Sequence, residues 1–111
     1  MSHWIDICSV DELVPNAGIC ALVNQKQIAI FYIPKMDQLF AIDNFDPFSN
    51  TNVLSRGMIG DLNGEPMVAS PMYKHHFSLI TGQCFEESSV VNDIYEIRVF
   101  NDYVKINISK A

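Results

Sequence analysis

The chain has 111 residues, of which 49% are apolar and only 18% are charged, and its 7 basic and 13 acidic side chains give a formal net charge of −6. This length fits one domain spanning residues 1–111, and so apolar a composition excludes a disordered chain. An acidic chain lacks the basic surface that nucleic-acid binding requires, so DNA and RNA are not expected partners.

Nothing in the sequence predicts a membrane protein. The longest unbroken apolar run, residues 28–33, is far shorter than the roughly 20 residues that a membrane-spanning helix needs. The first residues do not show a basic segment followed by an apolar stretch, as a signal peptide would. We therefore expect no membrane partner and a cytoplasmic location.

The first half of the chain predicts a short helix followed by a β-meander. Ser9 and Glu12 have the spacing of a capping box, so a short helix is expected to begin there and to end by Pro15. Strands are predicted over residues 19–23, 28–33 and 38–42.

The first two of these strands predict a hairpin. If Gln25 and Lys26 form the centre of its turn, Val23 faces Ile28, Ala21 faces Ile30 and Ile19 faces Tyr32. The second strand is apolar at nearly every position, so both of its faces are expected to be covered.

The C-terminus predicts a second antiparallel hairpin. A turn centred on Asn101 and Asp102 pairs three sets of apolar residues on one face, namely Val99 with Val104, Ile97 with Ile106 and Tyr95 with Ile108. The opposite face then carries polar and charged residues. Together the two hairpins make an all-β architecture.

Residues 43–73, between the hairpins, read mostly as loop. Pro and Gly interrupt the segment repeatedly, and its apolar residues are scattered singly. So long a loop inside a compact domain is typically functional, and we interpret it in that way.

The cysteines predict free thiols. Cys8, Cys20 and Cys84 are odd in number and widely spaced, and no Cys-x-x-Cys pair occurs among them. We expect Cys8 and Cys20 to behave as small core side chains and Cys84, which follows Thr81-Gly82, to lie nearer the surface.

The order of sequence segments in the middle of the chain resembles that of a Rieske domain. The segments that carry the resemblance are Phe40-Ala41-Ile42-Asp43-Asn44, a loop with Pro47, Leu54-Ser55-Arg56-Gly57, Gly64 to Pro71, and Phe77 to Gly82. The resemblance implies a Rieske-like antiparallel β-sandwich with a short helix and an inserted loop-rich subdomain, here residues 43–82, which holds a [2Fe–2S] cluster in that family.

All four cluster ligands are missing. Aligned on the two Rieske loops, Asp46 and Ser70 stand where the family has cysteine, and Phe48 and Tyr73 stand where it has histidine. These side chains cannot supply two thiolates and two imidazoles, so we expect no cluster and no other metal in this chain. We expect Phe48 and Tyr73 to fill the vacated space, and Asp46 and Ser70 to cap loop amides or to hydrogen-bond to each other.

One branch of the Rieske superfamily shows the same losses. The segment from Ala69 to Leu79, ASPMYKHHFSL, followed by Thr81-Gly82-Gln83-Cys84, is similar to the small subunits of cytoplasmic NAD(P)H-dependent assimilatory nitrite reductase. That resemblance implies a non-redox subunit of an oxidoreductase, with no catalytic residue and no cofactor of its own. It implies a large partner subunit that carries FAD, an iron–sulfur cluster and sirohaem and reduces nitrite to ammonium in nitrate and nitrite assimilation.

Two other classes of function stay open on the residues. One is a Rieske-type ferredoxin that carries electrons to an oxygenase, which the missing ligands disfavour. The other is a stand-alone module that recognises a small anion or another protein through the same two loops, in which side chains fill the space of the cluster.

The low share of charged residues, 18%, predicts an apolar docking surface for the large subunit. The candidates lie on the loops that hold iron in Rieske domains, and they are Phe45, Phe48, Met58, Ile59, Met72 and Lys74. Lys74 stands where a Rieske loop has glycine, and its cation suits a carboxylate of the large subunit or a nucleotide phosphate; a solvated surface lysine is the other interpretation.

The remaining polar candidates predict structure rather than chemistry. His75 and His76 are adjacent, so in an extended segment they point to opposite faces and do not chelate one metal; we expect one ring under the loop and the other in solvent. Glu86 and Glu87 read as a solvated loop, and no nucleophile–base pair is evident.

Overall fold

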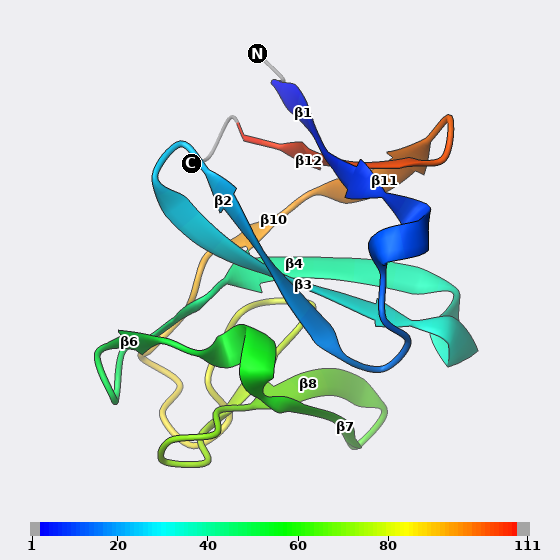
Figure 1. Cartoon of the computed structure of the whole chain (residues 1–111). Helices are drawn as coiled ribbons and strands as arrows, with labels where there is room; N and C mark the ends of the chain where they lie inside the picture. The colour runs from blue at the N-terminus through cyan, green and yellow to red at the C-terminus, as the bar shows by residue number, and fades with distance from the viewer. Residues whose placement is uncertain (1–2, 109–111) are drawn as a thin grey trace.

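The chain folds into short antiparallel strands with three single-turn 3₁₀ helices, as the computed structural model of residues 3–108 shows (Figure 1). This confirms the all-β prediction. No helix in this described range is long and apolar enough to cross a membrane. The elements in chain order are β1 (Trp4–Ser9), η1 (Val10–Glu12), β2 (Gly18–Val23), β3 (Lys26–Ile33), η2 (Pro34–Met36), β4 (Gln38–Asp43), β5 (Phe45–Asp46), β6 (Thr51–Asn52), η3 (Leu54–Arg56), β7 (Met58–Leu62), β8 (Glu65–Ala69), β9 (His76–Ser78), β10 (Ile94–Tyr95), β11 (Ile97–Phe100) and β12 (Tyr103–Asn107).

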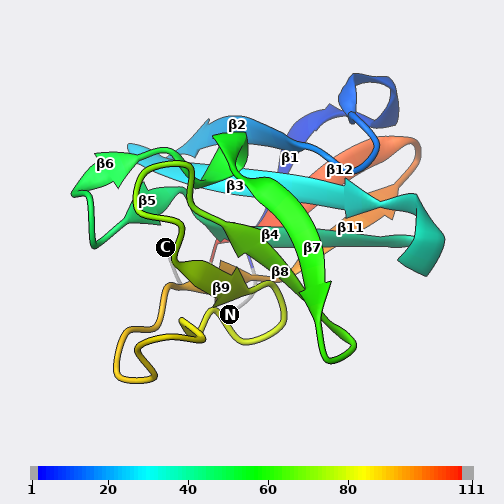
Figure 2. The same cartoon turned by 90° about the horizontal axis from the view of Figure 1, so that it is seen from below.

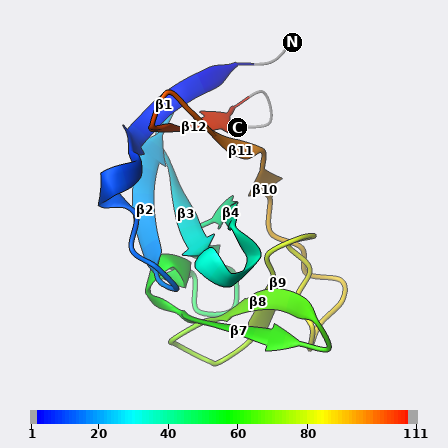
Figure 3. The ribbon, with the colours of Figure 1, turned by 90° about the vertical axis from the view of Figure 1, so that its right-hand side faces the viewer.

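The strands form three layers. Two sheets, ordered β1-β12-β11 and β10-β4-β3-β2, make a part that we call the base. Residues 44–92, which we call the lobe, add the small β5-β6 pair and the sheet β7-β8-β9. Figure 3 shows the first base sheet at the top, the second in the middle and the lobe at the bottom. In Figure 2 the lobe lies in front of β3 and β4.

The middle layer is buried on both faces because successive side chains of a strand point to opposite sides. On β3, Ile28 and Ile30 pack into the core between the two base sheets. Ala29 and Phe31, which alternate with them, pack into the core between the base and the lobe. The prediction that both faces of this strand are covered is confirmed.

The predicted register of the first hairpin is wrong by two residues. Val23 lies opposite Lys26, and Ala21 lies opposite Ile28. The turn is centred on Asn24 and Gln25, which both have positive φ, 49° and 69°, as a tight two-residue hairpin turn requires. A shift of two residues keeps every side chain on its predicted face.

The C-terminal hairpin is confirmed near its turn and wrong at its far end. Val99 lies opposite Val104, and Ile97 lies opposite Ile106. Tyr95 does not face Ile108 but pairs with Ala41 of β4. The chain changes sheets at this point, so β10 belongs to the middle layer and β11 to the outer one.

The predicted N-terminal helix is one 3₁₀ turn, η1. The Ser9 hydroxyl accepts a hydrogen bond from the Asp11 backbone N–H, and the Glu12 carboxylate accepts one from the Ser9 backbone N–H, each at 3.2 Å. This is the expected capping box. The turn ends at Leu13, before Pro15 is reached.

The prediction that residues 43–73 are mostly loop is wrong. The segment contains β5, β6, η3 and the hairpin β7-β8, which turns at Asn63 and Gly64, both at positive φ. Gly60 lies inside β7 and Pro66 inside β8, and these residue types usually mark the end of a strand. They conceal the alternation that would otherwise have revealed the hairpin.

The lobe is attached to the base through η3. Leu54 is fully buried in the shared core with Ala29 and Phe31, and η3 packs against β2 and β3. A Cβ at Gly18 of β2 would collide with the Ser55 carbonyl, so glycine permits this close approach.

We predict that Leu54→Ala lowers the free energy of unfolding by about 2–5 kcal/mol, because it opens a cavity between lobe and base. Denaturant unfolding followed by tryptophan fluorescence and by circular dichroism measures this loss. The two probes should report one shared transition. A loss below about 1 kcal/mol, or a separate transition for the lobe, would show that the two parts are not joined in this way.

Candidate functional site

The candidate site is one end of the lobe, which we call the tip. Two loops meet there, the first loop (residues 46–50) and the tip loop (residues 70–75), and Met58 at the start of β7 also belongs to the tip. Asp46 begins the first loop and closes it from both ends. Its Oδ1 accepts a hydrogen bond from the Phe48 backbone N–H at 2.9 Å, and its backbone carbonyl accepts one from the Asn50 N–H at 2.8 Å. Asp46 is fully buried.

Ser70 begins the tip loop and closes it in the same manner. Its backbone N–H donates to the His75 carbonyl at 2.9 Å, and its carbonyl accepts from the Lys74 N–H at 3.1 Å. Its hydroxyl accepts from the Met72 N–H at 3.3 Å. Both loops are therefore turns with their own backbone hydrogen bonds.

A single side-chain hydrogen bond joins the two loops. The Ser70 hydroxyl donates to Asp46 Oδ2 at 2.5 Å, and both side chains have no exposed surface. Both arrangements expected for these two residues therefore occur, since each side chain also accepts a hydrogen bond from an amide of its own loop. Both carboxylate oxygens of Asp46 thus have donors, which makes its burial tolerable.

An aromatic stack fills the space beside this bond. The rings of Phe48 and His75 lie 3.7 Å apart between centroids and are inclined by only 4°, and Phe77 packs against Phe48 with centroids at 6.2 Å. The expectation that Tyr73 fills the space is wrong, because its side chain is 62% exposed. His75 has taken that place; its Nδ1 is buried without a hydrogen-bond partner.

The arrangement does not fit a [2Fe–2S] cluster. The two positions that hold cysteine in Rieske domains carry a carboxylate and a hydroxyl that are bonded to each other, and the first histidine position carries a stacked phenyl ring. None of these groups is a thiolate or an imidazole. Within residues 3–108, no group of three or more His, Cys, Asp or Glu side chains is placed to hold a metal ion.

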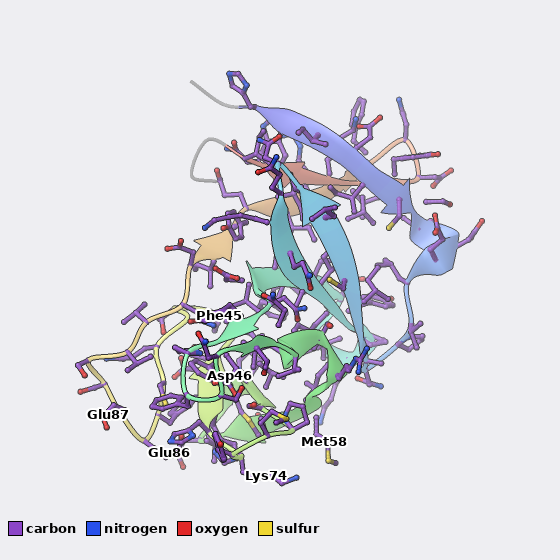
Figure 4. All side chains as sticks on the ribbon, turned by 60° about the vertical axis from the view of Figure 1, so that its left-hand side comes forward. Phe45, Asp46, Met58, Lys74, Glu86 and Glu87 are labelled. Atoms are coloured by element: carbon purple, nitrogen blue, oxygen red, sulfur yellow. The ribbon has the colours of Figure 1, made fainter. Side chains whose placement is uncertain are left out.

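The six proposed docking residues differ in accessibility. Met58 is 76% exposed, Met72 is 50% exposed and Lys74 is exposed. In Figure 4, Met58 and Lys74 project from the lower end of the molecule, whereas Phe45 lies higher, nearer the base. Phe45, Phe48 and Ile59 are half-buried, and the latter two pack against the core. The structure therefore concentrates accessible candidates on the tip loop and at the start of β7.

Tyr73 is an accessible residue of the tip that the sequence did not reveal, because an aromatic ring at this position was expected in the interior. It also did not place His75 against Phe48. Adjacent His75 and His76 gave no signal as to which ring turns inward.

A second group of polar residues borders the tip. The Glu86 carboxylate accepts a hydrogen bond from the His76 backbone N–H at 2.8 Å and lies 2.6 Å from the His76 ring Nδ1. Burial opposes ionisation of Glu86, but these contacts with His76 outweigh it and lower the pKa of the Glu86 carboxyl. Glu86 and Glu87 are otherwise exposed, as expected, and extend from the loop at the lower left of Figure 4.

Two expectations about the cysteines are wrong. Cys84 is buried, because it forms a β-bridge with Phe77 and enters the core of the lobe, where burial raises the pKa of its thiol. Cys20 is exposed rather than in the core, and Cys8 is half-buried. All three cysteines are free thiols, as predicted.

Comparison with known proteins identifies relatives that span the whole domain. Residues 3–107 match the model of the Rieske-like [2Fe-2S] domain. The chain is 45% identical over 106 residues to the nitrite reductase (NADH) small subunit of Escherichia coli K12, which covers 96% of this chain and 98% of the relative. The NMR structure of the E. coli protein NirD has a TM-score of 0.88 and 45% identity, covering 96% of this chain and 97% of that one.

Two further similarities are informative. A stretch of 82 residues is 48% identical to part of the nitrite reductase [NAD(P)H] large subunit of Klebsiella oxytoca, covering 73% of this chain and 8% of that much longer one. The ferredoxin of carbazole 1,9a-dioxygenase from Nocardioides aromaticivorans IC177 has a TM-score of 0.80 at 17% identity, covering 95% and 97%. The last similarity shows the fold alone.

We predict that Ser70→Ala destabilises the protein by about 1–3 kcal/mol, because the buried Asp46 carboxylate loses one donor. Thermal unfolding measures this loss, with Ser88→Ala on an exposed loop as a control expected to change stability by less than about 0.5 kcal/mol. Equal stability of the two variants would show that the bond between the loops does not hold the tip.

Proposed function

The chain belongs to the Rieske-like [2Fe-2S] domain family and, within it, to the small subunits of NADH nitrite reductase, and we propose that it acts as such a subunit without a redox centre of its own. The observation that carries the proposal is near-full-length similarity to these subunits combined with a tip whose cluster positions are occupied by a bonded Asp46–Ser70 pair. Residues 43–82 would then be the counterpart of the cluster-binding subdomain, with the same fold but without the cluster.

The proposed partner is the nitrite reductase large subunit. The K. oxytoca protein named as a large subunit contains a stretch similar to most of this chain, so in that protein the two are parts of one polypeptide. Such a fusion supports a working position of this domain against the large subunit. We propose that the partner holds FAD, an iron–sulfur cluster and sirohaem, and that the complex reduces nitrite to ammonium with NAD(P)H in the cytoplasm.

The contribution of this chain would be to bind and orient, because the cluster positions carry no thiolate or imidazole and no group of three or more His, Cys, Asp or Glu side chains within residues 3–108 is placed to hold a metal ion. The bond between Asp46 and Ser70 and the stack of Phe48 on His75 fix the tip loop before any partner arrives. A surface that is already ordered loses little conformational entropy on binding. We propose that the tip docks on the large subunit through Met58, Met72 and Lys74, with the half-buried Phe48 and Ile59 packed on the core behind them and the half-buried Phe45 at the edge of the contact nearer the base.

A Rieske-type ferredoxin is the second functional class that the fold admits. The donor set speaks against it, since an electron carrier of that kind needs two thiolates and two imidazoles. A stand-alone binding module is the third class. Experiment distinguishes it from a reductase subunit, because such a module would function without the large subunit.

We predict that the cognate large subunit, purified alone, reduces nitrite with NAD(P)H at a small fraction of the rate of the complex. Addition of this chain should restore the rate in a saturable manner. The measurement is steady-state oxidation of NAD(P)H in the presence of nitrite, with ammonium quantified. A large subunit that works at full rate alone would contradict the proposed function.

We predict that the double variant Met58→Ala, Met72→Ala weakens binding to the large subunit by about 10–100-fold, because exposed apolar side chains of an interface core carry much of its affinity. Leu22→Ala is the matched control, since Leu22 is 73% exposed but lies on β2 of the base. Titration calorimetry measures the Kd of both variants for the large subunit. Weakening by Leu22→Ala alone would place the interface on the base.

A further inference from the structure

The backbone at Lys74 adopts a conformation that its residue type disfavours. Within residues 3–108, nine residues other than glycine have positive φ: seven are Asn or Asp, one is Gln25, and the ninth is Lys74 at φ 65°. Asn and Asp tolerate this left-handed region because their short polar side chains hydrogen-bond locally, whereas lysine has no such compensation. Gln25 is explained by its place in a tight hairpin turn.

The fold of the tip loop imposes this conformation. The Lys74 backbone N–H donates to the Ser70 carbonyl, and the Ser70 N–H in turn donates to the His75 carbonyl, so the chain must reverse at position 74. Glycine or asparagine would satisfy this geometry with less strain. The loop requires the backbone of residue 74 and does not require a lysine there.

The ammonium group of Lys74 has no partner among the described residues. Asp46 is bonded to Ser70 and to the Phe48 amide, Glu86 is paired with His76, and no ion pair joins Lys74 to Glu87 among the described residues. Two other lysines are paired, Lys26 with Asp43 and Asp93 and Lys105 with Asp6, whereas the exposed Lys35 on η2 has no ion pair among the described residues. A strained backbone position thus carries an unpaired cation.

The setting of this cation is that of an interface. Met72 and Tyr73, the two preceding residues, are 50% and 62% exposed, so apolar surface adjoins the charge. Figure 4 shows Lys74 pointing away from the strands at the far end of the lobe. Strained residues persist where the surrounding structure holds them, and they cluster at functional positions.

We propose that Lys74 is the electrostatic anchor of the tip and pairs with a carboxylate on the large subunit. The proposal rests on the function proposed above and adds the chemistry of the contact. A carboxylate fits better than a nucleotide phosphate, because the tip loop offers a single cation and the neighbouring Glu86 and Glu87 would repel a multiply charged anion.

The test separates strain from binding by substituting residues that suit the backbone. Lys74→Asn and Lys74→Gly should raise the Tm of the isolated small subunit by about 2–6 °C, because the strain at φ 65° is relieved. The same variants should raise the Kd for the cognate large subunit at least about 10-fold, since the partner carboxylate is left unpaired. Stability and affinity would move in opposite directions.

Two further variants act as controls. Lys74→Arg keeps the charge and should bind within about 3-fold of the wild type, with the same weakening by added NaCl. Lys35→Asn removes an exposed lysine on η2, outside the lobe, and should leave the Kd unchanged. Binding of Lys74→Asn should depend less on salt than binding of the wild type.

Several outcomes would overturn the proposal. A Kd of Lys74→Asn within about 2-fold of the wild type would make Lys74 a solvated side chain. A fall in Tm together with lost binding would make it a structural residue of the loop. Binding of NADH or ATP to the isolated chain that disappears in Lys74→Asn would assign the cation to a phosphate. Absence of any wild-type complex would reject the proposed function as well, which distinguishes the two failures.

Discussion

The hydrogen bond between Ser70 and Asp46 is the contact on which the rest of the lobe depends. It is the one side-chain bond between the first loop and the tip loop that the described residues contain, and both groups are fully buried. A carboxylate without water is unfavourable unless donors satisfy it, so these residues must remain together once the loops fold. In a Rieske domain the corresponding positions hold an inorganic cluster, which fixes two loops by coordination. Here a carboxylate, a hydroxyl and a stacked pair of rings fix them by hydrogen bonding and packing. The shape of the cluster-binding end is retained while its chemistry is absent.

The layered architecture explains why this end can stay ordered. Alternate residues of β3 supply both cores, so the core beneath the lobe is continuous with the sheet that forms the base. Leu54, Phe77 and Cys84 come from different segments of the lobe and converge on that core. The backbone of the tip therefore rests on a packed core, and the side chains that it exposes are those of Met58, Met72, Tyr73 and Lys74. An apolar surface that carries an unpaired cation is suited to recognition of a partner. This agrees with membership of a family of small subunits whose relatives are named as parts of nitrite reductase.

Much of this could be predicted from the sequence, and the failures have physical causes. The alternation of apolar and polar residues predicts the strands of the base, and the capping box at Ser9 predicts η1. Both succeed because local rules determine them. The register of the first hairpin was wrong because a turn of two residues, Asn24 and Gln25, needs two positive φ values that composition does not reveal. The hairpin β7-β8 was missed because Gly60 and Pro66 interrupt its pattern. The missing cluster ligands could be read directly from the residue types, but which ring fills the space could not: Tyr73 and His75 are two residues apart, and only the tertiary fold turns one outward and the other onto Phe48. The strain at Lys74 is likewise a property of the loop rather than of the sequence pattern.

The central claim is that side chains, and not a cluster or a partner, hold the tip in place. Hydrogen–deuterium exchange of the small subunit alone, purified without oxygen and assayed for iron and acid-labile sulfide, tests it most directly. We expect no stoichiometric iron and slow exchange at the Phe48, Ser70 and Lys74 amides, whose hydrogen bonds close the two loops. Stoichiometric iron and sulfide, or exchange at these amides that becomes slow only when the large subunit binds, would contradict the claim.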